Sequence, residues 1–168
     1  DVVNQFLIVS AGTYDPATGL YRHAFDASRK MAWADSLTGQ APHAWGRAMG
    51  WFSMAIVDVL DFLPADQTGR DQMIDILNRM VKKLAEIQDP ATGGWYQVLD
   101  RSGDEGNYIE TSCTAMFAYS IFKGVRMGYL DAEYLATAEK AYRGLLDNFI
   151  VTGPDGLVTM KNICGVAG

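Results

Sequence analysis

A near-repeat of one turn sequence is the feature that most constrains how this chain can fold. Asp15-Pro-Ala-Thr-Gly-Leu-Tyr21 returns as Asp89-Pro-Ala-Thr-Gly-Gly-Trp-Tyr96, and a looser version follows at Pro154-Asp-Gly-Leu-Val158. The aspartates of successive copies are 74 and 66 positions apart. Proline presets φ and glycine accepts positive φ, so each copy predicts a tight turn. A period near 70 is longer than that of the common solenoid repeats and fits a unit of two helices and a long loop.

Helical periodicity fills the segments between these turns. Residues 42–63 predict a helix, because apolar residues recur every three to four positions between Pro42 in its first turn and Pro64 just past its end. Residues 69–88 predict a second helix with Thr68 as its N-cap. This second helix has an apolar stripe with charged residues off it, which is typical of an amphipathic surface helix.

The second unit repeats this alternation. Residues 108–127 are apolar nearly all round, which is typical of a buried helix. Residues 132–149 follow Asp131 as N-cap and carry apolar residues on one face and charged residues on the other. Residues 2–12 predict a short helix before the first turn.

Buried and amphipathic helices in alternation predict two layers of antiparallel helices. We therefore expect an all-α fold of about five helices in alternating inner and outer layers, as in part of a six-hairpin α/α barrel, or toroid. Strand patterns extend over only a few residues, near 94–99 and 156–160. A closed ring of six hairpins needs twelve helices, so we interpret residues 1–168 as a partial barrel domain, truncated at both ends. Opening a ring exposes buried helix flanks, so we expect the remainder of the barrel or self-association to cover them.

Composition excludes several functions. Apolar residues make up 49% of the chain and charged residues 20%, as in globular proteins, and no apolar run approaches the roughly 18 residues of a membrane span. The net charge of −6 argues against a nucleic-acid partner. Cys113 and Cys164 form neither a disulfide framework nor a CxxC pair, and no metal-ligand cluster, phosphate-binding loop or nucleophile elbow occurs. We therefore expect no metal, cofactor, nucleic acid or membrane as a partner.

The loops before the two buried helices, together with the first turns of those helices, hold the chain's unusual polar and aromatic residues. The candidates are His23, Trp33, Trp45, Arg47, Trp51, Tyr108 and Glu110. In a toroid the N-termini of inner helices face one end of the ring, where their free N–H groups favour an anionic ligand. Aromatic rings beside a few polar groups are typical of a site that binds sugars.

Arg47 is the most informative of these residues. It lies four positions before Trp51, so the two side chains share one face of the helix. A charge on a buried helix needs an anionic or acceptor partner, because an unpaired buried charge is very costly. An intramolecular carboxylate and a substrate carboxylate held by two hydrogen bonds both satisfy this need, and the sequence leaves both open. Gly46 and Gly50, also four apart, would let a neighbouring helix approach closely.

Several candidates also have a purely structural interpretation. Taken alone, Trp45 and Trp51 are more typical of core aromatics, and a lone loop histidine such as His23 is more typical of structural hydrogen bonding. Glu110 can cap its own helix, and Cys113 is typical of small core filler.

Four segments carry a resemblance to a known family. They are Gly19-Leu-Tyr-Arg-His-Ala-Phe-Asp26, Ala44-Trp-Gly-Arg-Ala-Met-Gly-Trp51, Gly94-Trp-Tyr-Gln97 and Asn107-Tyr-Ile-Glu-Thr-Ser112. They resemble glycoside hydrolase family 105, the unsaturated rhamnogalacturonyl hydrolases, which are related to the unsaturated glucuronyl hydrolases of family 88. The resemblance covers essentially the whole chain, and the WxRxxGW pattern with its upstream GLYxHxxD is fairly specific. It implies a six-hairpin α/α barrel.

The resemblance also implies a reaction. Members of that family act on an unsaturated uronic acid at the non-reducing end of pectin fragments. An aspartic acid protonates the C4=C5 enol ether, water adds at C5, and the resulting hemiketal releases the neighbouring sugar. This hydration differs from displacement at the anomeric carbon, yet it still requires a carboxylic acid tuned to donate a proton.

By the same resemblance, four residues match positions that line the family's substrate pocket. These are His23, Trp45, Arg47 and Trp51, with Trp33, Tyr108 and Glu110 as further pocket candidates. The family's general acid lies in a segment before the residues that match Asp1, so no residue of this chain is assigned a catalytic role, and we expect the chain alone to be inactive. An unsaturated uronide oligosaccharide is the implied ligand.

A function of another class also fits the sequence. A non-catalytic carbohydrate-binding toroid or scaffold would show the same aromatic-rich loops and would need no acid. A helical protein-interaction module fits less well, because the aromatic residues gather in loops expected at one end of the ring.

Overall fold

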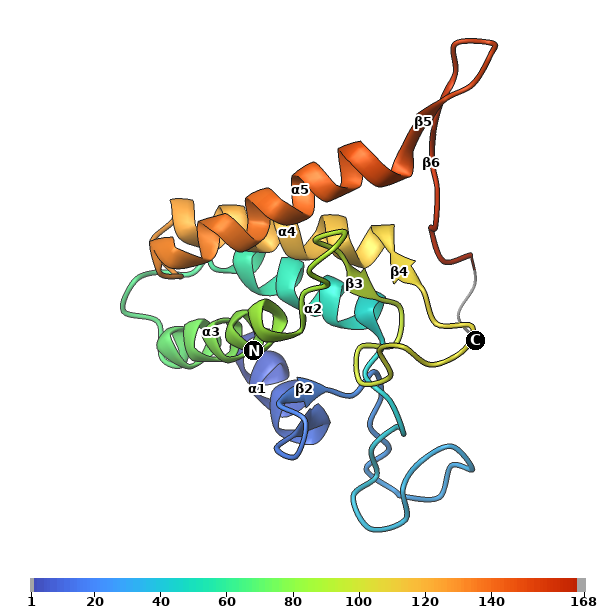
Figure 1. The fold of residues 1–168 in the computed structure, drawn as a ribbon. Helices are drawn as coiled ribbons and strands as arrows, with labels where there is room; N and C mark the ends of the chain where they lie inside the picture. Colours follow the sequence, from blue (N-terminus) through green and yellow to red (C-terminus); the bar gives the residue numbers. More distant parts are fainter. Residues whose placement is uncertain (1, 166–168) are drawn as a thin grey trace.

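The computed structural model describes residues 2–165 and is mostly helical (Figure 1). The α-helices are α1 (Val2–Thr13), α2 (Gly46–Val59), α3 (Arg70–Ile87), α4 (Thr111–Arg126) and α5 (Leu135–Phe149), with a 3-10 turn η1 (Ala132–Tyr134) before α5. The five expected helices are therefore confirmed among these residues. None of them is long and apolar enough to cross a membrane.

Three short antiparallel hairpins depart from a purely α chain. They pair β1 (Tyr14–Asp15) with β2 (Leu20–Tyr21), β3 (Trp95–Tyr96) with β4 (Ile109–Glu110), and β5 (Ile150–Thr152) with β6 (Val158–Met160). The sequence indicated strand character near β3 and β6 only. Strands of two or three residues are too short to show alternation, so the other four gave no pattern to detect.

The repeated turns have the roles that the sequence predicts. Asp15 accepts hydrogen bonds from the Ala17 N–H and the Thr18 hydroxyl, at 3.0 and 2.8 Å. Asp89 accepts from the N–H and hydroxyl of Thr92, at 2.7 and 2.6 Å. Both copies close with a glycine at positive φ, which is Gly19 in the first copy and Gly93 in the second.

Helix boundaries differ from the predicted ones where strand-like pairing intervenes. The helix expected over 42–63 begins at Gly46, because Trp45 is extended and pairs with Val98. The helix expected over 108–127 begins at Thr111, because the two preceding residues form β4.

The N-caps predicted for α3 and α5 have different outcomes. The N-cap of α3 is Gly69 in the left-handed region, so the assignment of Thr68 is wrong. Asp131, predicted as the N-cap of a helix over 132–149, accepts a hydrogen bond from the Glu133 N–H and caps the 3-10 turn, whereas α5 begins at Leu135 with Tyr134 as its N-cap.

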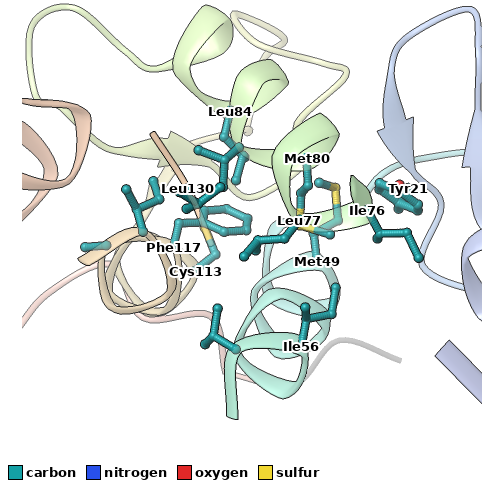
Figure 2. Packing of buried hydrophobic residues seen from close by; sticks show 14 of the residues in the cluster. Tyr21, Met49, Ile56, Ile76, Leu77, Met80, Leu84, Cys113, Phe117 and Leu130 are labelled. Atoms are coloured by element: carbon teal, nitrogen blue, oxygen red, sulfur yellow. The ribbon is translucent and has the colours of Figure 1, made fainter. Parts of the chain in front are cut away.

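The helices pack in a chain of contacts, with α2 against α4, α4 against α5, α3 against α2 and α1 against α3 (Figure 1). Side chains from α2, α3 and α4 meet in one core (Figure 2). The stripe predicted for α3 is buried there, including Leu77, Met80 and Leu84. Each such fully buried side chain contributes about 1.5–3 kcal/mol, so this core dominates the stability of the fold.

Two glycines bring α2 and α4 together. A Cβ on Gly46 would lie 2.8 Å from the Cys113 sulfur, and one on Gly50 would lie 2.7 Å from the Met116 sulfur. The close helix approach predicted from this glycine pair is therefore confirmed. Because α2 and α4 pack so closely, their N-termini and the residues that those termini carry lie side by side.

Candidate active site

The candidate site is built where α2 and α4 begin. The Gly46 N–H donates to the Gln97 carbonyl at 2.8 Å, and the Thr111 N–H donates to the Asn162 carbonyl at 3.1 Å. The loop after β3 thus fixes the start of α2, and the segment after β6 fixes the start of α4. Backbone contacts that span long sequence separations therefore set the geometry of the site.

Arg47 lies between these two helix starts. Its Nε donates to the Ser112 hydroxyl at 3.0 Å, and its Nη2 donates to the Cys164 carbonyl. Its Nη2 also lies 3.7 Å from a carboxylate oxygen of Glu110. Arg47 therefore has an intramolecular carboxylate partner, which was one of the two possibilities that the sequence left open. The Arg47 side chain is still 18% exposed, so an incoming ligand can reach it.

Glu110 is the fully buried anion of the site. It is the N-cap of α4, and its carboxylate accepts hydrogen bonds from the N–H groups of Ser112, Cys113 and Cys164. Burial alone would raise the pKa of Glu110, but these hydrogen bonds and one from the Ser112 hydroxyl hold its pKa below the usual range. The capping role predicted for Glu110 is confirmed, and its carboxylate stays charged at neutral pH.

Trp45 connects Arg47 to His23. The Arg47 guanidinium carbon lies 5.7 Å from the centre of the Trp45 ring, in cation–π range. The exposed His23 ring meets the same indole edge-on, with ring centroids 6.4 Å apart. The Trp45 Nε1–H is buried and has no hydrogen-bond partner among residues 2–165. The structure thus gathers three of the four residues matched to the family pocket.

The other candidates lie in different surroundings. Trp51 follows Arg47 by one turn and is 58% exposed, so the interpretation of Trp51 as a core aromatic is wrong. Tyr108 is half-buried; burial raises its pKa, with the Cys164 thiol and Glu110 adding to the effect. Trp33 lines a separate hollow of about 390 Å³ together with Arg22, and Arg47 is not among the lining residues of that hollow.

Sequence reasoning missed an ionic network beside the site. Asp100 accepts from the Ala44 N–H at 2.9 Å and pairs with Arg22 at 2.7 Å and with the His43 Nδ1 at 3.2 Å. Arg22 also pairs with Asp15 at 2.5 Å. Burial opposes ionisation of Asp100, but hydrogen bonds from Ala44, His43 and Arg22 hold its pKa below the usual range. The network joins the turn that begins at Asp15 to the loops that precede α2 and α4.

Ser112 and Cys164 were also missed. Ser112 follows Glu110 within a helix start, where a serine has an ordinary capping explanation. Cys164 is 117 positions from Arg47, and a backbone carbonyl contact over that separation leaves no local sequence signal.

Two carboxyl groups in the loop before α2 are poor proton donors. Hydrogen bonds from the Met31 N–H, the Ser28 hydroxyl and nearby N–H groups lower the pKa of Asp26 to about 2. Hydrogen bonds from the Thr38 N–H and hydroxyl lower the pKa of Asp35. A general acid needs a raised pKa, so these groups suit structure rather than proton donation. Among residues 2–165, no cluster of three His, Cys, Asp or Glu side chains is placed to hold a metal ion.

This chain is similar to known proteins in both sequence and fold. The sequence model of the family described as Glycosyl Hydrolase Family 88 matches residues 1–168. Protein Atu3128 of Agrobacterium fabrum is 38% identical over 172 positions, which cover all of this chain and 72% of that protein. The unsaturated rhamnogalacturonyl hydrolase YesR of Bacillus subtilis is 26% identical over 90% of this chain.

A solved structure is more similar still. The family 105 glycoside hydrolase of C. acetobutylicum ATCC 824 is 45% identical, with a TM-score of 0.95 over 99% of this chain. The chain spans 46% of the length of that hydrolase and 40% of the length of YesR.

Proposed function

The chain belongs to Glycosyl Hydrolase Family 88, and from this premise we propose that it forms part of a hydrolase of unsaturated uronic acid oligosaccharides. The proposed substrate is an unsaturated rhamnogalacturonyl oligosaccharide derived from pectin. The proposed reaction is hydration of the C4=C5 enol ether followed by release of the neighbouring sugar. The name of YesR, an unsaturated rhamnogalacturonyl hydrolase, supports this substrate class.

The arrangement of Arg47, Trp45 and His23 is the observation that carries this proposal. A uronate ligand presents a carboxylate and an apolar ring face, and these two features need a cation beside an aromatic ring. Arg47 lies 5.7 Å from the Trp45 ring, with His23 on the same indole. We assign Arg47 to the uronate carboxylate or the neighbouring hydroxyls, and assign Trp45 and the exposed Trp51 to the sugar ring.

The proton donor is proposed to come from outside residues 2–165. Glu110, Asp100, Asp26 and Asp35 all have lowered pKa values, so each is ionised where the reaction needs a carboxylic acid. Within this chain we therefore propose binding and orientation of the substrate and no proton transfer.

We also propose that residues 1–168 are a partial six-hairpin α/α barrel domain. An apolar groove of about 430 Å³ between α4 and α5 supports this proposal, because a further hairpin would bury it. Its lining includes Tyr119, Phe122, Tyr142 and Leu146. Without such cover, the 168-residue chain should self-associate in sedimentation, whereas a monodisperse monomer would contradict the proposal.

Calorimetry tests the binding role. The natural full-length protein is titrated with an unsaturated uronide disaccharide and with its saturated equivalent, alongside Arg47→Ala and a control variant, Arg101→Ala. Arg101 is a suitable control because its ion pair with Asp104 is exposed and lies outside the site. We expect Arg47→Ala to weaken binding of the unsaturated ligand by roughly tenfold or more and Arg101→Ala to leave it unchanged. Equal affinity of the two variants would refute the role of Arg47.

A non-catalytic carbohydrate-binding protein is the second candidate, favoured by the lowered pKa values of the carboxyls around the site. It predicts equal binding of the saturated and unsaturated ligands, with no turnover by the full-length protein. Preferential binding of the unsaturated ligand together with its turnover would exclude this alternative.

A further inference from the structure

Two of the acceptors that hold Arg47 belong to different parts of the chain. One is the Ser112 hydroxyl, in the first turn of α4, which accepts from Nε at 3.0 Å. The other is the Cys164 carbonyl, in the segment after β6, which accepts from Nη2. Hydrogen bonds at Nε and Nη2 fix the plane of a guanidinium group, because the group is rigid and flat.

The same buried carboxylate holds both of these acceptors. One oxygen of Glu110 accepts from the Ser112 hydroxyl at 2.8 Å, and the other accepts from the Cys164 N–H at 2.9 Å. The Ser112 hydroxyl therefore donates to Glu110 and offers its lone pair to Arg47. Thr111 secures the Cys164 segment further, since its hydroxyl donates to the Lys161 carbonyl at 2.8 Å.

We propose that Glu110 and Ser112 are positioning residues that orient Arg47 for its ligand, and that Glu110 does so without touching the ligand. The carboxylate of Glu110 is fully buried, so it acts on Arg47 through Ser112 and Cys164 and through its charge, 3.7 Å from Nη2. The Nε and Nη2 side of the guanidinium is occupied by protein atoms, and Nη1 donates to the Gly165 carbonyl at 3.4 Å, the longest of the three hydrogen bonds. An incoming carboxylate would therefore reach Arg47 at Nη1. The ligand-binding part of this inference rests on the proposed function; the orientation of Arg47 does not.

This assignment changes what Glu110 contributes to the site. A carboxylate facing the ligand would repel a uronate, whereas a carboxylate behind the arginine strengthens the orientation of the cation. Capping of α4 and positioning of Arg47 then depend on the same four hydrogen bonds, so the N-terminus of α4 and the arginine are set together.

Ser112→Ala tests the inference, and Ser120→Ala is its matched control. Both changes remove a hydroxyl from α4, but the Ser120 hydroxyl bonds to the Ser53 hydroxyl and the Met116 carbonyl. The first readout needs no ligand: it is the hydrogen-exchange rate of the Arg47 Nε–H by NMR, with the signal assigned by its loss in Arg47→Lys. We expect exchange to accelerate roughly tenfold or more in Ser112→Ala and to stay unchanged in Ser120→Ala. Ser112→Thr keeps a hydroxyl, so its exchange should be slower than that of Ser112→Ala. Unchanged exchange in Ser112→Ala would overturn the inference.

The second readout is the affinity of the full-length protein for an unsaturated uronide disaccharide. We expect Ser112→Ala to raise Kd roughly tenfold while Ser120→Ala leaves it unchanged, and Glu110→Gln to act in the same direction as Ser112→Ala. If Arg47→Ala weakens binding and Ser112→Ala does not, the inference fails and the proposed function stands. If no uronide binds the wild-type protein, the proposed function fails, and the exchange rate still decides whether Ser112 and Glu110 hold Arg47.

Discussion

Asp100→Ala should destabilise the fold more than any exposed ion pair could. Asp100 accepts from the Ala44 N–H and pairs with both Arg22 and His43, and only 11% of its side chain is exposed. Breaking a buried ion pair costs about 3–5 kcal/mol. The cost here lies at the lower end, because Arg22 keeps its ion pair with Asp15 and its own side chain is 15% exposed. We therefore expect a loss of about 3 kcal/mol in the free energy of unfolding. For a domain of this length that corresponds to a fall of about 6–12 °C in Tm.

Asp104→Ala is the matched control. It removes an aspartate from the same loop and breaks its pair with Arg101, in which the two side chains are about half exposed. Such surface pairs contribute about 0–1 kcal/mol, so thermal and urea unfolding should barely change. Equal losses of stability in Asp100→Ala and Asp104→Ala would refute the structural role assigned to the network.

The pH dependence of this effect has a definite sign. The pKa of Asp100 is lower in the folded protein than its ordinary value, so its stabilisation is present above the unfolded pKa. The stabilisation is then lost as pH falls through the folded pKa. The difference in unfolding free energy between wild type and Asp100→Ala should therefore be constant near neutral pH and shrink below about pH 4. A difference that grows on acidification would contradict this assignment.

Two further predictions concern packing and the exposed aromatic of the site. Gly144→Ala should cost about 3 kcal/mol or more in unfolding free energy, because the added Cβ would lie 1.7 Å from the Thr92 carbonyl oxygen. The control is Gly165→Ala, whose added Cβ would have no heavy atom within 4 Å and which should be nearly neutral in urea denaturation. Trp51→Ala should lower the unfolding free energy by less than about 1 kcal/mol yet weaken uronide binding. Trp95→Ala empties a fully buried position and should lower the unfolding free energy by about 3–5 kcal/mol. Similar melting temperatures for these two variants would contradict the difference in burial.

Periodicity was enough to predict the helices, since an apolar stripe is a local property of the sequence. The stripe of α3 and the glycine pair of α2 both pack as predicted. Helix starts were less predictable, because the pairing of Trp45 with Val98 delays α2 and depends on a loop some 50 positions away. Tertiary contacts of this kind override local propensity.

The candidate site shows the same division. The sequence placed Arg47 on a helix that needed an anionic partner, and the structure supplies Glu110 together with Ser112. The Cys164 carbonyl could not be predicted, because any residue offers the same backbone oxygen. Trp51 shows a different point: taken alone, a tryptophan is more typical of a core position, but the face of α2 that carries Trp51 is exposed.

The most direct test of the binding site is the turnover rate of an unsaturated uronide disaccharide by the natural full-length protein, followed by loss of the ultraviolet absorbance of the C4=C5 double bond. Wild type and Arg47→Ala are compared at equal concentration, with Arg101→Ala as the control. We predict that Arg47→Ala slows this loss by roughly a hundredfold or more, because the uronate is no longer oriented, while Arg101→Ala matches wild type. An Arg47→Ala protein that consumes the double bond at the wild-type rate would contradict the site described above.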